Sequence, residues 1–348
     1  MENMETFLGI DYPTLWYLVV GLLFSGYAIL EGFDYGAGAW HLFFRKDESR
    51  RIAINAIGPL WDANQVWLII GGGALFAGFP VMYATMLSAM YIPFMLFLML
   101  LVLRSAAIKF RSAEEMKWWR NSWDYIYFIS NTLIAFLLGV VLGNVLQGFA
   151  IGPNYSYQGG LFFTFLSPYA LMTGFTTLSL FMTQGAIFLL LKTEGRLHAR
   201  LTFLLRKGMI FFIISFSVTS LYTLIFIPGV TDNFRENPVF FIIPLLSFLA
   251  VANVPRLVSK KKYFQALLFS SLTMAFLLML VAFQLYPTLL ISTLNPKYSI
   301  TIYNAASSKK SLGIMLTIVL IGAPLLAFYF LFLYRTFKGK VILDDTSY

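Results

Sequence analysis

Cysteine is absent from this 348-residue chain, and charged residues are scarce. The absence of cysteine excludes disulfides, cysteine-ligated zinc sites and iron–sulfur clusters. Charged side chains make up 12% of the residues, against about 25% in an average soluble protein, whereas 59% are hydrophobic. This composition indicates a protein with many membrane-spanning segments and leaves no stretch for a sizeable soluble domain.

Histidine is also scarce, since the chain has only two. Haem iron usually takes its axial ligands from His or Met, and sometimes from Cys or Tyr. His41 follows the first apolar run and His198 lies in a basic segment, so neither is expected near the middle of a span. The 14 methionines are spread through apolar stretches, where packing accounts for them. We therefore expect no haem or metal site formed by this chain alone.

Nine apolar runs approach or exceed the roughly 20 residues that a membrane-spanning helix needs. They cover residues 14–40, 52–77, 80–103, 123–149, 164–191, 208–228, 238–255, 263–289 and 312–334. The sequence therefore predicts an all-α polytopic membrane protein with one integral membrane domain over residues 1–348. The second run is the weakest on hydropathy, because Pro59 and Asp62 interrupt it.

The distribution of positive charge supports the second run as a span. All but four of the 25 basic residues follow odd-numbered spans, and the exceptions are Arg235, Lys297, Lys309 and Lys310. Short cytoplasmic loops carry an excess of Lys and Arg, so this pattern places the N-terminus outside and the C-terminus in the cytoplasm. Eight spans without residues 52–77 would put the first four basic residues on the wrong side. The net charge of +9 thus reflects membrane orientation and does not indicate a nucleic-acid partner.

The polar cluster at residues 61–67 (Trp-Asp-Ala-Asn-Gln-Val-Trp) lies within the second apolar run. An ionised carboxylate at the centre of a spanning helix costs about 2.5–3.5 kcal/mol on insertion scales. In one helix starting at residue 52, Asp62, Gln65 and Trp61 would share part of the surface. One interpretation is a proton or ion site inside a helix bundle. The other is that Asp62 caps a helix broken near Pro59.

A second group of polar residues ends the first apolar run. Glu31 and Asp34 are one helical turn apart and so share a face, with glycines around them. For Asp34 an ordinary polar helix end explains the pattern equally well, whereas Glu31 lies deeper in the run. Arg104 ends the third predicted span, where it either anchors the helix at the membrane surface or pairs with a buried carboxylate such as Asp62.

Several motifs resemble those of one known family. Residues 31–38 (Glu-Gly-Phe-Asp-Tyr-Gly-Ala-Gly) resemble the Asp-Gly-Phe-Asp-x-Gly-x-Gly motif of subunit II of cytochrome bd-type quinol oxidases, with Glu31 where many members have Asp. Residues 50–68 and 72–80 are similar to that family almost residue by residue. Shorter similarities lie at 121–124, 143–148 and 183–186. The resemblance runs from about residue 10 to 335 and is densest over 31–148.

This resemblance implies a fold and an activity. Subunit II of the family has nine helices, arranged as two four-helix bundles and a peripheral helix. It pairs with a haem-bearing subunit I, which holds two b haems, a d-type haem and the quinol site. The complex oxidises quinol and reduces dioxygen to water with protons from the cytoplasm, which builds a membrane potential without pumping. A structural quinone and small single-helix accessory subunits are further expected components.

The resemblance also implies roles for particular residues. A proton pathway is expected to involve Asp62, Glu31, Asp34, Asn64 and Gln65, with Arg104 as their charge partner. Oxygen is expected to enter near Trp67 and Trp61.

Two other functions stay open from the sequence. A secondary transporter could use Glu31 and Asp62 as coupling sites, although no inverted repeat is visible. A purely structural partner of subunit I would carry the same motifs without conducting protons. A haem spectrum of the purified complex separates the transporter from the other two.

Overall fold

The computed structural model describes residues 6–227 and 238–343, so Arg235 and the predicted end of the sixth span at residue 228 lie outside the described residues. Its α-helices are α1 (Tyr12–Ala39), α2 (Asp47–Ile57), α3 (Trp61–Gly78), α4 (Pro80–Ala89), α5 (Tyr91–Phe110), α6 (Lys117–Gln147), α7 (Pro168–Lys192), α8 (Gly195–Phe226), α10 (Ile242–Ser259), α11 (Tyr263–Leu285) and α12 (Lys309–Thr336). Short 3-10 helices are η1 (His41–Phe43), η2 (Pro153–Tyr155), η3 (Phe162–Phe165), η4 (Pro238–Phe241) and η5 (Pro296–Tyr298).

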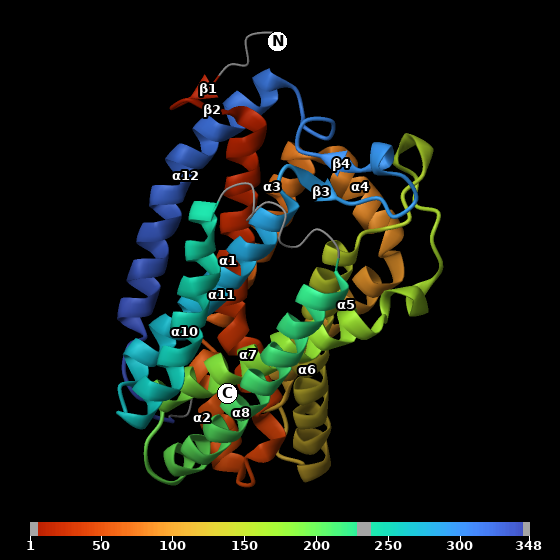
Figure 1. Ribbon diagram of the computed structural model, residues 1–348. Coiled ribbons are helices and arrows are strands. Elements are labelled where there is room, and N and C mark those ends of the chain that lie inside the picture. Colours follow the sequence, from red (N-terminus) through yellow and green to blue (C-terminus); the bar gives the residue numbers. More distant parts are fainter. Residues whose placement is uncertain (1–5, 228–237, 344–348) are drawn as a thin grey trace.

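The all-α prediction is confirmed, apart from two small hairpins. Strands β1 (Thr6–Phe7) and β2 (Ile10–Asp11) pair antiparallel, as do β3 (Thr288–Leu290) and β4 (Ile300–Thr301). Both hairpins lie at the upper end of the molecule in Figure 1, together with the N-terminal end of α1. The lower end holds α2 and the start of α8.

Eight helices in the described residues are long and apolar enough to cross a membrane. A ninth span results if α3 and α4, which are bent by 117° relative to each other, count as one broken span. The count of eight or nine agrees with the nine predicted spans. The arrangement as two four-helix bundles and a peripheral helix stays a prediction.

Two predicted spans are wrong as single helices. The run at 52–77 is split into α2 and α3 around Pro59, because proline has no N–H to donate and its ring clashes with the preceding turn. The run at 80–103 is split into α4 and α5 at Met90, and α5 continues to Phe110. Arg104 therefore lies inside a helix, not at its end.

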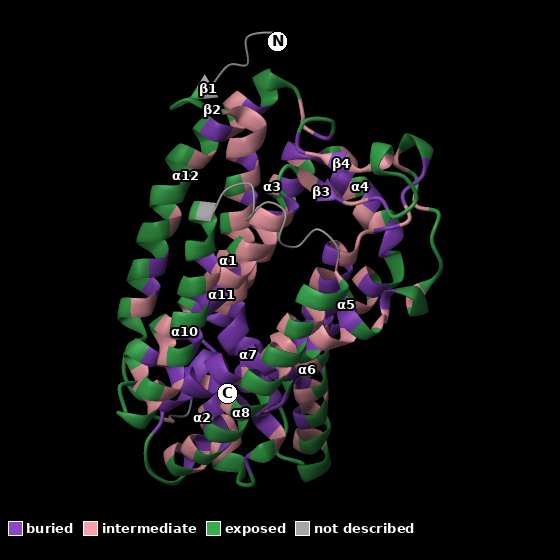
Figure 2. Ribbon diagram, in the orientation of Figure 1, coloured by how far each residue is buried: buried purple, intermediate pink, exposed green. Residues whose placement is uncertain are grey.

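Helix α7 is the centre of the structure. It packs against α1, α6, α8 and α11. Figure 2 shows the buried residues gathered around α7 and the lower part of α1, whereas α12 is mostly exposed. A side chain at Gly36 of α1 would overlap the backbone carbonyl of Phe181 in α7, and one at Gly185 would overlap the backbone of α1. These glycines let the two helix backbones touch, as small residues do between membrane helices.

Candidate functional site: a buried carboxylate–arginine cluster

Two carboxyl groups and one guanidinium meet in the interior of the bundle. Glu31 and Asp34 of α1 and Arg104 of α5 are all fully buried. Arg104 Nη1 lies 2.9 Å from Glu31 Oε2, and Nη2 lies 3.7 Å from Asp34 Oδ2. The predicted shared face of Glu31 and Asp34 is confirmed, and Arg104 is their charge partner. Asp62, the other partner considered for Arg104, forms no ion pair with it in the described part of the chain.

Two further helices complete the cluster through hydrogen bonds. Asn64 of α3 donates from Nδ2 to Asp34 Oδ2 at 2.9 Å. Tyr334 of α12 donates its hydroxyl hydrogen to Asn64 Oδ1 at 3.0 Å. Helices α1, α3, α5 and α12, which are far apart in the sequence, are therefore linked through Asp34 and Asn64.

Aromatic rings cover the guanidinium. Arg104 Cζ lies 4.6 Å from the centre of the Tyr35 ring and 5.8 Å from that of Trp61. The Tyr35 hydroxyl is hydrogen-bonded to the Tyr27 hydroxyl at 2.6 Å. Such cation–π contacts stabilise a desolvated guanidinium by about 2 kcal/mol or more.

The cluster keeps unused hydrogen-bonding capacity. Both oxygens of Glu31, Asp34 Oδ1 and all three nitrogens of the Arg104 guanidinium are buried without a hydrogen-bond partner among the described residues. The 2.9 Å contact between Arg104 and Glu31 is thus an ion pair by distance that lacks hydrogen-bond alignment. With both carboxyls ionised, the three side chains carry one net negative charge, and a buried net charge is costly. The cluster can take up one proton and become neutral.

Asp62 lies elsewhere than predicted. Its side chain is exposed on the surface of this chain, so the expected burial inside a bundle is wrong. The break at Pro59 restarts the helix at Trp61, which turns Trp61 and Asn64 inward and Asp62 outward. Asp62 is not the cap of α3 either, because the N-cap residue Leu60 has no side-chain hydrogen bond.

Asp62 is nevertheless next in the chain to a residue of the buried cluster. Its neighbour Trp61 has its ring centre 5.8 Å from Arg104 Cζ, and Asn64, two positions further on, donates to Asp34. Gln65 and Trp67 are half-buried on the same helix. The Trp67 ring packs against Phe330 of α12, with 5.6 Å between ring centres, and its indole nitrogen has no hydrogen-bond partner among the described residues.

A second polar cluster was missed by the sequence interpretation. Asp124 of α6 is nearly fully buried and accepts hydrogen bonds from Arg50 Nη1 at 2.8 Å and Arg111 Nε at 2.6 Å. It also forms a short hydrogen bond with His41 Nε2. Arg111 also donates a hydrogen bond from Nη2 to Asp47 Oδ1 at 2.6 Å. The residues stand at positions 41–124 with no common spacing, so no pattern in the sequence could have joined them.

The two histidines are both engaged. His41 is fully buried against Asp124, and His198 Nδ1 lies 3.2 Å from the carbonyl oxygen of Thr193. In the described part of the chain no three His, Asp or Glu residues are placed to hold a metal ion. Nε2 of His41 is hydrogen-bonded to Asp124, and His198 lies in the first turn of α8, so the absence of a haem ligand from this chain stays a prediction.

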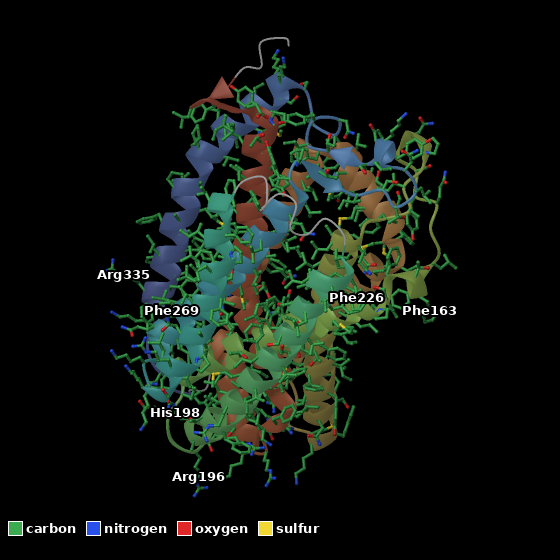
Figure 3. The ribbon with its side chains drawn as sticks, in the orientation of Figure 1. Phe163, Arg196, His198, Phe226, Phe269 and Arg335 are labelled. Atoms are coloured by element: carbon green, nitrogen blue, oxygen red, sulfur yellow. The ribbon has the colours of Figure 1, made fainter. Side chains whose placement is uncertain are left out.

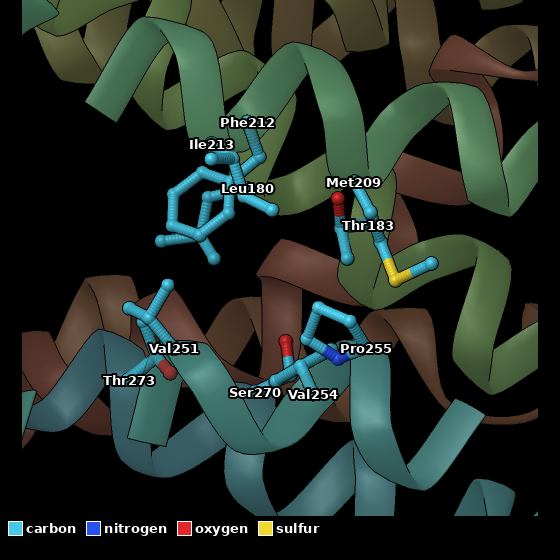
Figure 4. A pocket seen from close by; sticks show the side chains of 10 residues that line it. All are labelled: Leu180, Thr183, Met209, Phe212, Ile213, Val251, Val254, Pro255, Ser270 and Thr273. Carbon is cyan, nitrogen blue, oxygen red and sulfur yellow. The ribbon is translucent and has the colours of Figure 1, made fainter. Parts of the chain in front are cut away.

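A small cavity lies between α7, α8, α10 and α11 (Figure 4). Its volume of about 10 Å³ is close to what a single water molecule needs. The hydroxyls of Thr183 and Ser270 line it, and the Ser270 hydroxyl has no hydrogen-bond partner among the described residues. A cavity of this size does not hold the ring of a quinone or a haem.

The fold and the buried cluster define a polytopic membrane subunit with ionisable groups in its interior. Residues 12–337 match the family of cytochrome bd terminal oxidase subunit II, and the chain belongs to this family. It is 31% identical over 369 residues to the cytochrome bd-I ubiquinol oxidase subunit 2 of Escherichia coli (strain K12), covering 97% of both chains. It is 32% identical over 332 residues to the cytochrome bd ubiquinol oxidase subunit 2 of Bacillus subtilis (strain 168), covering 94% of this chain and 96% of the relative.

A solved structure supports the fold. The bd oxidase from Geobacillus thermodenitrificans contains a chain that matches with a TM-score of 0.74. The match covers 94% of the present chain and 98% of the other, at 21% sequence identity. At this identity the likeness concerns the fold.

Proposed function

We propose that this chain is the non-haem-bearing subunit II of a terminal quinol:oxygen oxidoreductase in the bacterial cytoplasmic membrane. The full-length match to two subunits that are named as ubiquinol oxidase components carries the proposal. The partner is a haem-bearing subunit I with two b haems and a haem d, or a third b haem, at the oxygen site.

Within this complex the chain contributes to proton access from the cytoplasm. The surface carboxylate of Asp62 lies on α3 between Trp61, whose ring covers Arg104, and Asn64, which donates to Asp34. Glu31 shares Arg104 with Asp34. A carboxyl that exchanges protons with the cytoplasm and a buried pair with room for one proton are the two parts that a relay needs. We assign Asn64 and Gln65 to the same proton route, because both follow Asp62 on α3.

Oxygen access near Trp67 and Trp61 is the second proposed role. The supporting observation is that Trp67 is half-buried at the contact of α3 with α12, and its indole nitrogen has no partner among the described residues. A structural quinone, membrane lipids and small single-helix subunits are the remaining proposed partners. The charge asymmetry of the loops supports an outer N-terminus and a cytoplasmic C-terminus.

The Asp62→Asn variant tests the proton route. Asn keeps the size of the side chain and removes its titration, so we expect an assembled complex with normal haem content and quinol-driven oxygen uptake reduced about tenfold or more. Asp62→Glu should retain part of the activity. Haem spectra and oxygen consumption of the purified complexes measure both effects.

The matched control is Glu115→Gln, which removes an exposed carboxylate outside the spans. A fully assembled Asp62→Asn complex with wild-type turnover would remove Asp62 from the proposed route. It would leave the purely structural role of this chain as the better explanation.

A further inference from the structure

A concave surface at the lower end of the molecule is lined by cations from two separate segments. One segment links η1 to α2, and the other is the first turns of α8. The lining residues are Phe44, Arg45, Lys46, Ser49, Arg196, Leu197 and Arg200. The cavity has a volume of about 260 Å³. Figure 3 shows Arg196 projecting at this end of the molecule.

The four cations in this cavity have no carboxylate partner among the described residues. Arg45, Lys46, Arg196 and Arg200 form no ion pair with the described residues. Nε of Arg200 is buried and lacks a hydrogen-bond partner among those residues. Of the acidic residues next to these segments, Asp47 is engaged with Arg111 and Arg120, whereas Glu48 and Glu194 form no ion pair among the described residues.

The general rule for positive cytoplasmic loops explains on which side these residues lie, but not why four of them surround one cavity. Loops obey that rule equally well with cations spread over the surface. Four uncompensated charges repel one another, so a site that holds them together is stabilised by a bound anion.

The cavity supplies the groups that bind a phosphate. Arginine binds phosphate oxygens with two parallel hydrogen bonds, and lysine adds a point charge. Helix α8 begins beside the cavity at Gly195, and its N-cap residue Glu194 makes no side-chain capping hydrogen bond. The free N–H groups of a first helical turn also attract anions.

We propose that this cavity binds the phosphate of an anionic phospholipid headgroup. The cavity lies where two membrane-spanning helices end or begin, Tyr12–Phe43 and Gly195–Phe226, which is the level of lipid headgroups, and this favours a lipid phosphate over free phosphate. The cytoplasmic leaflet carries anionic lipid, and Lys and Arg residues near its surface are attracted to it. The choice of leaflet depends on the proposed orientation, whereas the binding measurement below does not.

The test uses the purified two-subunit complex in detergent, titrated with dioctanoyl-phosphatidylglycerol, and native mass spectrometry counts the bound lipid. Dioctanoyl-phosphatidylcholine and inorganic phosphate are the comparison ligands. We expect saturable binding of phosphatidylglycerol, at least fivefold tighter than that of phosphatidylcholine. Binding should weaken about tenfold or more in the Arg196→Gln/Arg200→Gln double variant.

The control double variant is Lys260→Gln/Lys262→Gln, which removes two exposed cations outside the cavity. Equal weakening in both double variants, or no saturable binding of phosphatidylglycerol to the wild-type complex, overturns the proposal. Inorganic phosphate that displaces the lipid at equal concentration would identify free phosphate as the ligand and overturn the assignment to lipid.

If the Gln variant does not assemble, Arg196→Lys/Arg200→Lys replaces it in the test. This variant keeps the charge but loses the paired hydrogen bonds, and unchanged affinity in it overturns the proposal.

Discussion

The two polar clusters of this chain use the same kinds of residues in opposite proportions. In the buried cluster around Arg104, called the upper cluster below, two carboxyls, Glu31 and Asp34, share this single cation. In the second cluster around Asp124, called the lower cluster below, two carboxylates are bound by three arginines and one histidine. Those residues are Asp47, Asp124, Arg50, Arg111, Arg120 and His41.

The proportions decide what each cluster can do. In the lower cluster the cations outnumber the carboxylates, and their ion pairs tie together η1, α2, α6 and the end of α5. An excess of carboxyls leaves the upper cluster with atoms that lack hydrogen bonds and with room for one proton. We infer that the lower cluster stabilises the fold and that the upper cluster exchanges protons.

Removal of Arg104 should have the largest effect on assembly. Arg104→Gln leaves Glu31 and Asp34 buried without a counter-charge, and breaking a buried ion pair from one side costs about 3–5 kcal/mol. We expect little or no assembled complex, measured as haem recovered with this chain after purification. The control Arg256→Gln removes an exposed cation from α10 and should assemble normally. A wild-type yield of the Arg104→Gln complex would show that the ion pair is not needed.

The Gly36→Ala variant, which pushes α1 away from α7, should have the next largest effect, a loss of stability of the complex. The Gly36→Ala side chain would overlap the Phe181 carbonyl, so the helices must move apart at the turn that holds Asp34. Overpacking of this kind costs about 1–3 kcal/mol. We expect a lower midpoint of thermal unfolding for the complex, whereas Gly72→Ala, which meets no atom within 4 Å, should leave it unchanged. Equal midpoints for the two variants would contradict the close packing of α1 on α7.

A smaller loss of stability is expected in the lower cluster. Asp124→Asn keeps an acceptor oxygen but loses the charge that binds Arg50 and Arg111. Because Arg111 keeps its ion pair with Asp47 and Arg50 is partly exposed, neither cation is left buried and unpaired, and we place the loss at about 1–2 kcal/mol. The complexes that do assemble should reduce oxygen at the wild-type rate per haem. A normal unfolding midpoint combined with reduced turnover would reverse the roles assigned to the two clusters.

The sequence predicted the parts of the upper cluster that depend on local spacing. Glu31 and Asp34 are three residues apart on one helix, and their shared face follows from helical geometry. The exposure of Asp62 could not be predicted, because the predicted burial assumed a continuous helix across Pro59, and the break there turned the side chain outward. The family resemblance assigned the neighbouring Asn64 to a proton pathway, which stays a prediction, and its hydrogen bond to Asp34 comes from the tertiary packing.

The lower cluster could not be predicted from residue spacing, because its members are far apart in the sequence. Asp124 binds His41, which is 83 positions away, and Arg50, which is 74 positions away. Such contacts arise from tertiary packing of η1, α2, α5 and α6. Arg111 and Arg120 were interpreted from the sequence only as cytoplasmic charges.

Glu31→Gln tests the difference between the clusters most directly, through quinol-driven oxygen uptake per haem in the purified complex. Gln removes one proton-binding group and leaves Arg104 with one carboxylate, Asp34, so the cluster stays neutral and the complex should assemble normally. We predict a turnover reduced about tenfold or more, since a positioned proton-transfer group typically contributes about 10²–10⁴ in rate. Asp124→Asn, measured in parallel, should keep its turnover. A Glu31→Gln complex with normal haem content and wild-type oxygen uptake would contradict the assignment of proton exchange to the upper cluster.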